Sequence, residues 1–145
     1  MPKRIKATPD GWKISVEATD MEMTPEDWTG QGTLRLACDS EPEERFLSAQ
    51  TIVIVFPAFT DGRALSLAVL LRKRFGYKGH LRATGATHQD IVHYIIRCGF
   101  DEIDVPPGRD ADLYLALLKP YTAHYQGSVR EPEPSFKRTS RGINA

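Results

Sequence analysis

Cysteine is scarce in this sequence of 145 residues, which contains only Cys38 and Cys98. They form no C-x-x-C pair, so the sequence offers neither a zinc ribbon nor a thioredoxin-type motif. Two thiolates are also too few for the usual four-cysteine iron–sulfur cluster. We expect both thiols to be buried and inert, as free cysteines commonly are, because a disulfide between them is unfavoured in a reducing compartment.

Long apolar runs and an excess of one charge are also missing. No segment approaches the roughly 20 apolar residues that span a bilayer. The basic start at Lys3 and Arg4 leads into no apolar segment of the kind found in signal peptides. Nineteen basic side chains balance nineteen acidic ones, whereas a dedicated nucleic-acid binder needs an excess of cations. We therefore expect a cytoplasmic protein that binds neither nucleic acid nor a membrane.

Cofactor and metal motifs are not found either. The glycines Gly30 and Gly32 lack the third glycine of a dinucleotide fingerprint, and no G-x-x-x-x-G-K-[ST] phosphate loop is present. His88 and His93 are five residues apart, whereas two metal ligands on one face of a helix are usually four apart. The sequence therefore predicts no cofactor and no metal site.

Strand and helix patterns alternate along the centre of the chain. The β-branched run at 51–56 is typical of a strand that is covered on both faces. A capping box, Thr87 to Asp90, predicts the start of a helix. The predicted strands cover 51–56, 80–84 and 102–105, and the predicted helices cover 61–75, about 87–99 and a segment from about 110. This order predicts an α/β fold with a mainly parallel sheet, built from successive right-handed βαβ units.

We assign residues 1–125 to a single domain whose βαβαβα core is 51–125. Residues 1–50 carry ten acidic and six basic side chains, with strand-like runs at 12–16 and 33–37 and a helix start at 24–27. We expect them to form an N-terminal α+β extension, docked as a layer on the main sheet. Residues 126–145 have no apolar periodicity and more basic than acidic side chains, which predicts a flexible basic C-terminal tail.

The loop after the first buried strand, Phe56 to Arg63, is the predicted site, because ligands of parallel sheets bind beyond the carboxyl ends of the strands. Gly62 lets the backbone approach a ligand closely, and the planar guanidinium of Arg63 suits a carboxylate, sulfate or phosphate. Arg82 comes near the end of the adjacent strand. We predict an anion pocket with the binding residues Thr60, Gly62, Arg63, Arg82 and Gly85.

Asp61 is the candidate catalytic residue of this loop, as an acid or a base. Capping alone also explains Thr60 and Asp61, because side-chain oxygens at this position accept hydrogen bonds from the first N–H groups of a helix. Arg63 would then pair with a surface acid. Both interpretations of the loop stay open at this point.

The same loop carries a resemblance to a known family. The segments Phe56–Arg63, Leu81–Ala83 with Gly85, and Arg97–Asp101 resemble an uncharacterised bacterial family. Its members are labelled "oxidoreductase probably involved in sulfite reduction" and tend to be encoded beside assimilatory sulfite reductase. The resemblance covers about residues 25–125, and Ala86 stands where family members often have an acidic residue.

The resemblance implies a role in sulfite reduction, and the residues narrow that role. A sulfite reductase needs sirohaem and clustered cysteines, and a flavin or nicotinamide reductase normally needs a glycine-rich phosphate loop. We therefore expect an accessory protein of assimilatory sulfite reduction, which binds a small anion or docks on the reductase or its electron carrier without a redox cofactor of its own. Two alternatives stay open: a small enzyme with its active site at loop 57–63, and a structural or oligomerisation module. A homo-oligomer is compatible with each of them.

Overall fold

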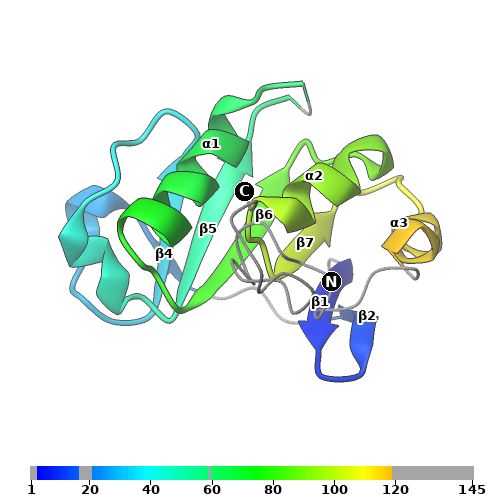
Figure 1. Cartoon of the computed structure of the whole chain (residues 1–145), viewed down its shortest axis with the longest axis horizontal. Coiled ribbons are helices and arrows are strands. Elements are labelled where there is room, and N and C mark those ends of the chain that lie inside the picture. Colours follow the sequence, from blue (N-terminus) through cyan, green and yellow to red (C-terminus); the bar gives the residue numbers. More distant parts are fainter. Residues whose placement is uncertain (1–2, 17–20, 59, 119–145) are drawn as a thin grey trace, which may run out of the picture.

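The computed structural model describes residues 3–16, 21–58 and 60–118. A seven-stranded sheet has the order β2-β1-β7-β6-β5-β4-β3 and carries helices α1 to α3 (Figure 1). The α/β fold class with a mainly parallel sheet is confirmed. The strands are β1 (Lys3–Thr8), β2 (Gly11–Val16), β3 (Glu22–Met23), β4 (Thr33–Ala37), β5 (Thr51–Phe56), β6 (His80–Gly85) and β7 (Glu102–Val105).

The helices are α1 (Arg63–Val69), α2 (Val92–Arg97) and α3 (Ala111–Leu118), with the short turns η1 (Pro25–Asp27), η2 (Glu44–Ser48), η3 (Leu70–Arg74) and η4 (Gln89–Ile91). The turn η3 has π-helical geometry and continues α1 directly. No helix in the described ranges has the length and apolar character that crossing a membrane requires. The predicted tail, 126–145, and the predicted boundary at 125 lie outside the described residues.

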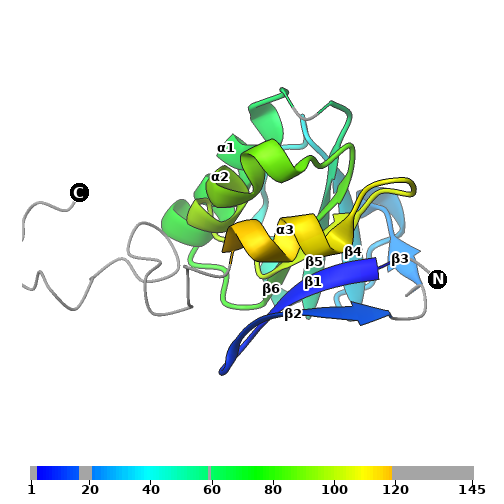
Figure 2. The same ribbon diagram turned by 90° about the vertical axis from the view of Figure 1, so that its right-hand side faces the viewer.

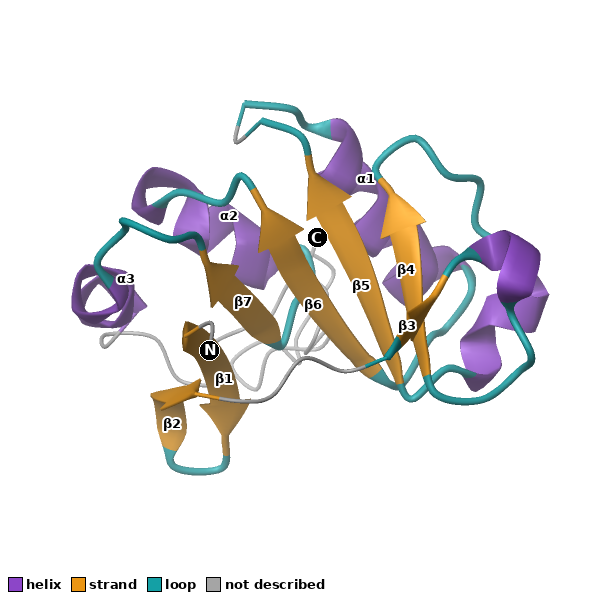
Figure 3. Ribbon diagram, turned by 180° about the vertical axis from the view of Figure 1, so that it is seen from behind, coloured by secondary structure: helices purple, strands orange, loops and turns teal. Residues whose placement is uncertain are grey.

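The parallel strands follow one another across the sheet in chain order. Strands β3 to β7 are all parallel neighbours, each paired with the next along the chain. Because right-handed crossovers that advance in one direction place their helices on the same side, α1 and α2 lie together on one face (Figures 2 and 3). The described strands therefore contain no reversal of order among the parallel set, which is where doubly wound sheets open a ligand crevice.

The N-terminal segment extends the sheet itself, and our prediction of a docked layer is wrong. Strand β1 pairs antiparallel with β7 and with β2, while β3 adds to the other edge beside β4. The sequence missed β1 because Ile5 is its single large apolar residue, flanked by the charged Arg4 and Lys6. Pairing with β7 buries Ile5 on the helix-covered face of the sheet.

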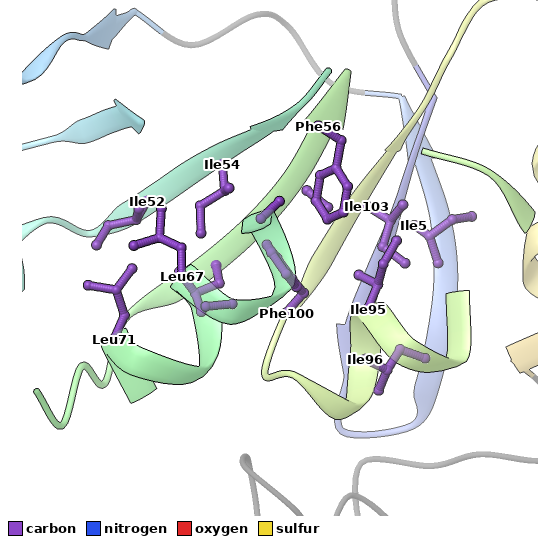
Figure 4. Close-up of a cluster of buried hydrophobic side chains, with 14 of the residues drawn as sticks. Ile5, Ile52, Ile54, Phe56, Leu67, Leu71, Ile95, Ile96, Phe100 and Ile103 are labelled. Atoms are coloured by element: carbon purple, nitrogen blue, oxygen red, sulfur yellow. The ribbon is translucent and has the colours of Figure 1, made fainter. Parts of the chain in front are cut away.

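The hydrophobic core lies between the sheet and the helices (Figure 4). Strand β5 contributes alternate side chains to this face, because successive residues of a strand point to opposite sides. The core pairs them with apolar side chains of α1, η3 and α2. Its fully or almost fully buried members include Ile5, Ile52, Ile54, Phe56, Leu67, Leu71, Ile95, Ile96, Phe100 and Ile103.

The start of the second helical segment differs from the predicted capping box. The hydroxyl of Thr87 is buried and bonded to the Asp104 carbonyl oxygen at 2.8 Å and to the Tyr114 hydroxyl at 3.1 Å. His88 provides the cap, because its Nδ1 accepts the backbone N–H of Asp90 at 3.0 Å. The predicted cap at Thr87 is therefore wrong, since packing against α3 occupies that hydroxyl.

Candidate functional site

The loop between β5 and α1 holds an ion pair between Asp61 and Arg63. Nε of Arg63 donates to Oδ1 of Asp61 at 3.0 Å, and Nη2 donates to Oδ2 at 2.7 Å. The backbone N–H of Arg63 donates to the same Oδ1 at 3.0 Å. One carboxylate therefore closes the turn before α1 and holds one edge of the guanidinium group.

This local structure follows from the sequence. An aspartate side chain readily accepts the N–H two residues ahead and so forms a turn before a helix. That acceptance starts α1 at Arg63, two residues after the predicted start at 61. The Asp61–Arg63 pair is the arrangement that the capping interpretation of the loop expects, with the acid supplied by the loop itself.

The ion pair sets the charge state of both groups. Hydrogen bonds from the Arg63 side chain and backbone lower the pKa of Asp61 to about 2. The same contacts raise the pKa of Arg63 further above its ordinary value. A proton-transfer group works best with a pKa near the working pH. Because the pKa of Asp61 is far below neutral pH, this carboxylate suits the positioning of Arg63 better than acid–base chemistry.

A shallow groove of about 460 Å³ runs beside this arginine. Its apolar part comes from Leu67 and Leu70, and its polar part from Arg63 and two hydroxyl groups; the lining residues are Ser40, Gly62, Arg63, Ser66, Leu67 and Leu70. The Arg63 side chain is 61% exposed, whereas that of Asp61 is only 16% exposed. The guanidinium group therefore stands at the rim of the groove with its carboxylate partner behind it.

The outer edge of the guanidinium is available to a ligand. Nε and Nη2 serve Asp61, while Nη1 makes no hydrogen bond within the described part of the chain. A planar guanidinium held by two bonds on one side keeps its orientation when a second anion arrives on the other. The arrangement can thus bind a carboxylate or a sulfur oxyanion through an arginine that is already oriented.

Arg82 does not reach this loop, and the predicted two-arginine pocket is wrong. Arg82 is the third residue of β6 and pairs in register with Val53 and Glu102. Its side chain lies on the face opposite the helices, 4% exposed, with Nε donating to Glu102 at 2.8 Å. Alternation along the strand decides this, because Leu81 and Ala83 take the core face.

The other three predicted binding residues, Thr60, Gly62 and Gly85, lie in or beside the loop. Gly85 has φ +90° and its backbone lies against Phe56, where an added Cβ would be 2.6 Å from the carbonyl oxygen. The next residue, Ala86, donates its N–H to that carbonyl at 2.8 Å. Gly85 therefore joins the ends of β5 and β6. Thr60 is exposed, and Gly62 lines the groove as the last residue before α1.

The sequence did not indicate that Cys38 and Ser40 belong to this region. The Cys38 thiol donates to Oδ2 of Asp61 at 3.7 Å, and burial raises its pKa. Burial likewise raises the pKa of Cys98, and both cysteines are free thiols. Parallel pairing of β4 with β5 brings the end of β4 beside the loop, and spacing in the sequence gives no sign of that pairing.

A second hollow, of about 530 Å³, lies near the amino ends of β4 and β5. Its lining is polar and uncharged: Thr29, Gln31, Gly32, Ser48 and Gln50. No group of three or more metal-ligating side chains occurs within residues 3–16, 21–58 and 60–118. Arg63 therefore makes the groove beside α1 the better candidate for a charged ligand.

A family of bacterial proteins of unknown function, DUF934, matches residues 34–136. The chain belongs to this family. The DUF934 match begins in β4 and includes the loop with Asp61 and Arg63, whereas β1 to β3 precede it. No curated protein and no solved structure matches the chain.

Proposed function

We propose that this chain is an accessory protein of assimilatory sulfite reduction, which binds a small anion or docks on the reductase or its electron carrier without a redox cofactor of its own. The sulfite-reduction context comes from the resemblance at Phe56–Arg63 and Arg97–Asp101. The observation that carries the binding mode is the oriented guanidinium of Arg63 at the rim of the groove.

The ion pair determines how this site would bind. Asp61 offsets the positive charge of Arg63, so long-range attraction of anions is weak. Its two hydrogen bonds fix the guanidinium before a ligand arrives, which reduces the side-chain entropy lost on binding. Such a site favours ligands with the right geometry over ligands with merely the right charge. The apolar side chains of Leu67 and Leu70 add a contact for the uncharged part of a ligand or of a partner's side chain.

In this proposal Asp61 is a positioning residue. Replacing it with asparagine removes the charge and keeps one oxygen that accepts the Arg63 N–H. We expect Asp61→Asn to retain the turn and to loosen the guanidinium, which weakens anion binding in spite of the less negative surroundings. Stronger binding by Asp61→Asn would show that the carboxylate acts only through repulsion.

Ligand binding is tested with purified protein and a panel of sulfite, sulfate and adenylyl sulfate. A ligand that binds only the folded state raises its Tm. We expect one of these anions to stabilise the wild type and to lose that effect in Arg63→Ala. Arg109→Ala is the matched control, since Arg109 is an exposed arginine on a different loop. Equal stabilisation of both variants would assign the effect to non-specific ion binding.

Docking is tested separately with purified subunits of sulfite reductase and its electron carrier. We expect one of them to bind the wild type in titration calorimetry, and Arg63→Ala to weaken that binding roughly tenfold, which corresponds to about 1.4 kcal/mol. The proposal would be contradicted if none of the anions raised the Tm of the chain and none of the subunits bound it. Normal growth of a deletion strain on sulfate would also contradict it.

A further inference from the structure

A surface of one charge sign covers the ends of α1 and α2. Four exposed cations form this basic surface: Lys73, Arg74, Lys78 and Arg97. The segments 72–80 and 97–100 that carry them contain no acidic residue. A compact region of positive potential follows, although the whole chain has a formal net charge of zero.

The side chain of Arg72 brings these segments together. Its Nη1 donates to the carbonyl oxygens of Tyr77 at 2.9 Å and Gly79 at 2.8 Å. Its Nε and Nη2 donate to the carbonyl of Gly99 at 3.0 and 2.8 Å. The backbone around Lys78 and the backbone after Arg97 therefore converge on η3, the turn that carries Lys73 and Arg74.

A second surface has the opposite sign. Four exposed carboxylates on η1 and at the start of η2 form this acidic surface: Glu26, Asp27, Glu43 and Glu44. Arg45 joins the two turns, because its Nη1 donates to the carbonyl of Pro25 at 3.3 Å and its own carbonyl accepts Nε1 of Trp28 at 3.0 Å. Its Nε pairs with Glu43 at 2.6 Å, which leaves the acidic surface with a net negative charge.

The two surfaces lie next to each other. The hydroxyl of Tyr77 donates to the carbonyl of Ala49, the residue that follows η2, at 2.9 Å. The loop that carries Lys78 is thus fixed beside the element that carries Glu44. Figure 1 shows the same neighbourhood, with the cyan segment after β4 beside the lower end of the green helix that begins as α1.

We propose that this face binds a second copy of the chain. A two-fold axis brings surface i of one copy onto surface j of the other and j onto i, so the basic surface of each copy meets the acidic surface of its partner. Neighbouring patches of opposite sign allow both contacts in one interface. Charge complementarity of this kind guides association and selects the partner.

A nucleic acid or an anionic membrane fits the face less well. Either one extends past the basic surface and meets the adjacent carboxylates, and four cations are fewer than the roughly six to ten phosphate contacts of typical DNA binders. The helix dipole favours Arg72, Lys73 and Arg74 in the last turn before Phe75. It accounts neither for Lys78, which lies outside that turn, nor for the acidic surface beside it.

The test is a charge exchange between the two surfaces, read by sedimentation velocity on the full chain. Lys73→Glu/Arg74→Glu reverses the basic surface, and Glu26→Lys/Glu44→Lys reverses the acidic one. These four side chains make no hydrogen bond or ion pair within the described part of the chain. Lys3→Glu/Lys13→Glu, on the β1–β2 hairpin, is the control with the same change of net charge as Lys73→Glu/Arg74→Glu.

We expect the wild type to dimerise at low salt and to dissociate at about 0.5 M salt, where the screening length falls below about 5 Å. Each reversed variant alone should weaken dimerisation at least roughly tenfold, because like charges then face each other in both contacts. An equimolar mixture of the two reversed variants should restore the dimer. The control variant should dimerise like the wild type.

Four outcomes would overturn the proposal: a wild type that stays monomeric at low salt, reversed variants that dimerise normally, a mixture that stays monomeric, or a control that loses dimerisation equally. Circular dichroism of each variant separates loss of folding from loss of contact. Binding of heparin or of anionic vesicles by a monomeric wild type would assign the basic surface to a polyanion. The Arg63 variants of the proposed function are expected to dimerise normally, so the two proposals can fail independently.

Discussion

Nη2 of Arg72 lies 2.7 Å from Oδ2 of Asp101, and the same oxygen accepts the backbone N–H of Leu81 at 3.0 Å. Arg72 belongs to η3 and Leu81 belongs to β6, and Asp101 is the residue just before β7. One largely buried ion pair thus joins the end of the first helical segment to two neighbouring strands. Arg72 lies in the π-helical turn η3, at the end of the first helical segment.

Replacing Arg72 should destabilise the fold strongly. Arg72→Ala removes the guanidinium that pairs with the carboxylate of Asp101 and the donors to Tyr77, Gly79 and Gly99. Breaking a buried ion pair costs about 3–5 kcal/mol, and we expect a loss of this order in the free energy of unfolding in urea. Arg72→Lys should recover only part of it, because one ammonium group cannot reproduce the planar fork. Lys73→Ala, on the same turn but exposed, should change stability by less than about 0.5 kcal/mol.

Substitutions at two glycines should distinguish the cost of backbone strain from the cost of a steric clash. Gly85 and Gly108 both have positive φ, +90° and +86°, but an added Cβ meets the Phe56 carbonyl only at Gly85. Gly108→Ala should cost roughly 1 kcal/mol, from the unfavourable backbone conformation alone. Gly85→Ala should cost more, by roughly 1–3 kcal/mol, because the ends of β5 and β6 must move apart. Equal loss of stability in the two variants would show that the ends of β5 and β6 move apart without cost.

The Asp61–Arg63 pair should make stability depend on acid pH. The pKa of Asp61 in the folded chain is about 2, below its ordinary value of 3.8. A carboxyl group with a lowered folded-state pKa stabilises the fold above its unfolded pKa and loses that contribution as the pH falls toward the folded value. Wild type should therefore lose stability relative to Asp61→Asn between about pH 4 and pH 2. Parallel Tm curves of the two proteins over this range would contradict the ion pair.

Both thiols should react slowly in the folded chain. Burial raises the pKa of Cys38 and of Cys98, and the thiolate is the reactive form. We expect alkylation by iodoacetamide at pH 7 to be at least roughly tenfold slower than in the urea-unfolded chain. Mass spectrometry of Cys38→Ser and Cys98→Ser variants assigns each rate to one thiol. Fast labelling of Cys38 in the folded chain would contradict the burial of its thiol.

Local pattern determined much of the fold. The β-branched run at β5 and the alternating run at β4 specify strands by themselves, because their side-chain period matches a pleated strand. The repeated order of strand and helix from β5 to β7 specifies parallel pairing, since the crossover between two parallel strands is usually an α-helix. The turn before α1 is also a local feature, because the Asp61 carboxylate accepts the N–H of a residue only two positions ahead.

Tertiary structure decided everything that depends on partners far along the chain. The sequence shows Arg63 and Arg82 as two cations in neighbouring loop and strand, and only the register of β6 places Arg82 on the opposite face with Glu102. The β1–β2 hairpin joins the main sheet through the pairing of β1 with β7, about a hundred residues away. The meeting of the basic and acidic surfaces depends in the same way on Arg72 and Tyr77. A hydrogen bond between near neighbours in sequence depends on residue types a few positions apart, so the sequence pattern predicts it. A contact across the sheet depends on how the whole chain packs, which the local sequence pattern does not determine.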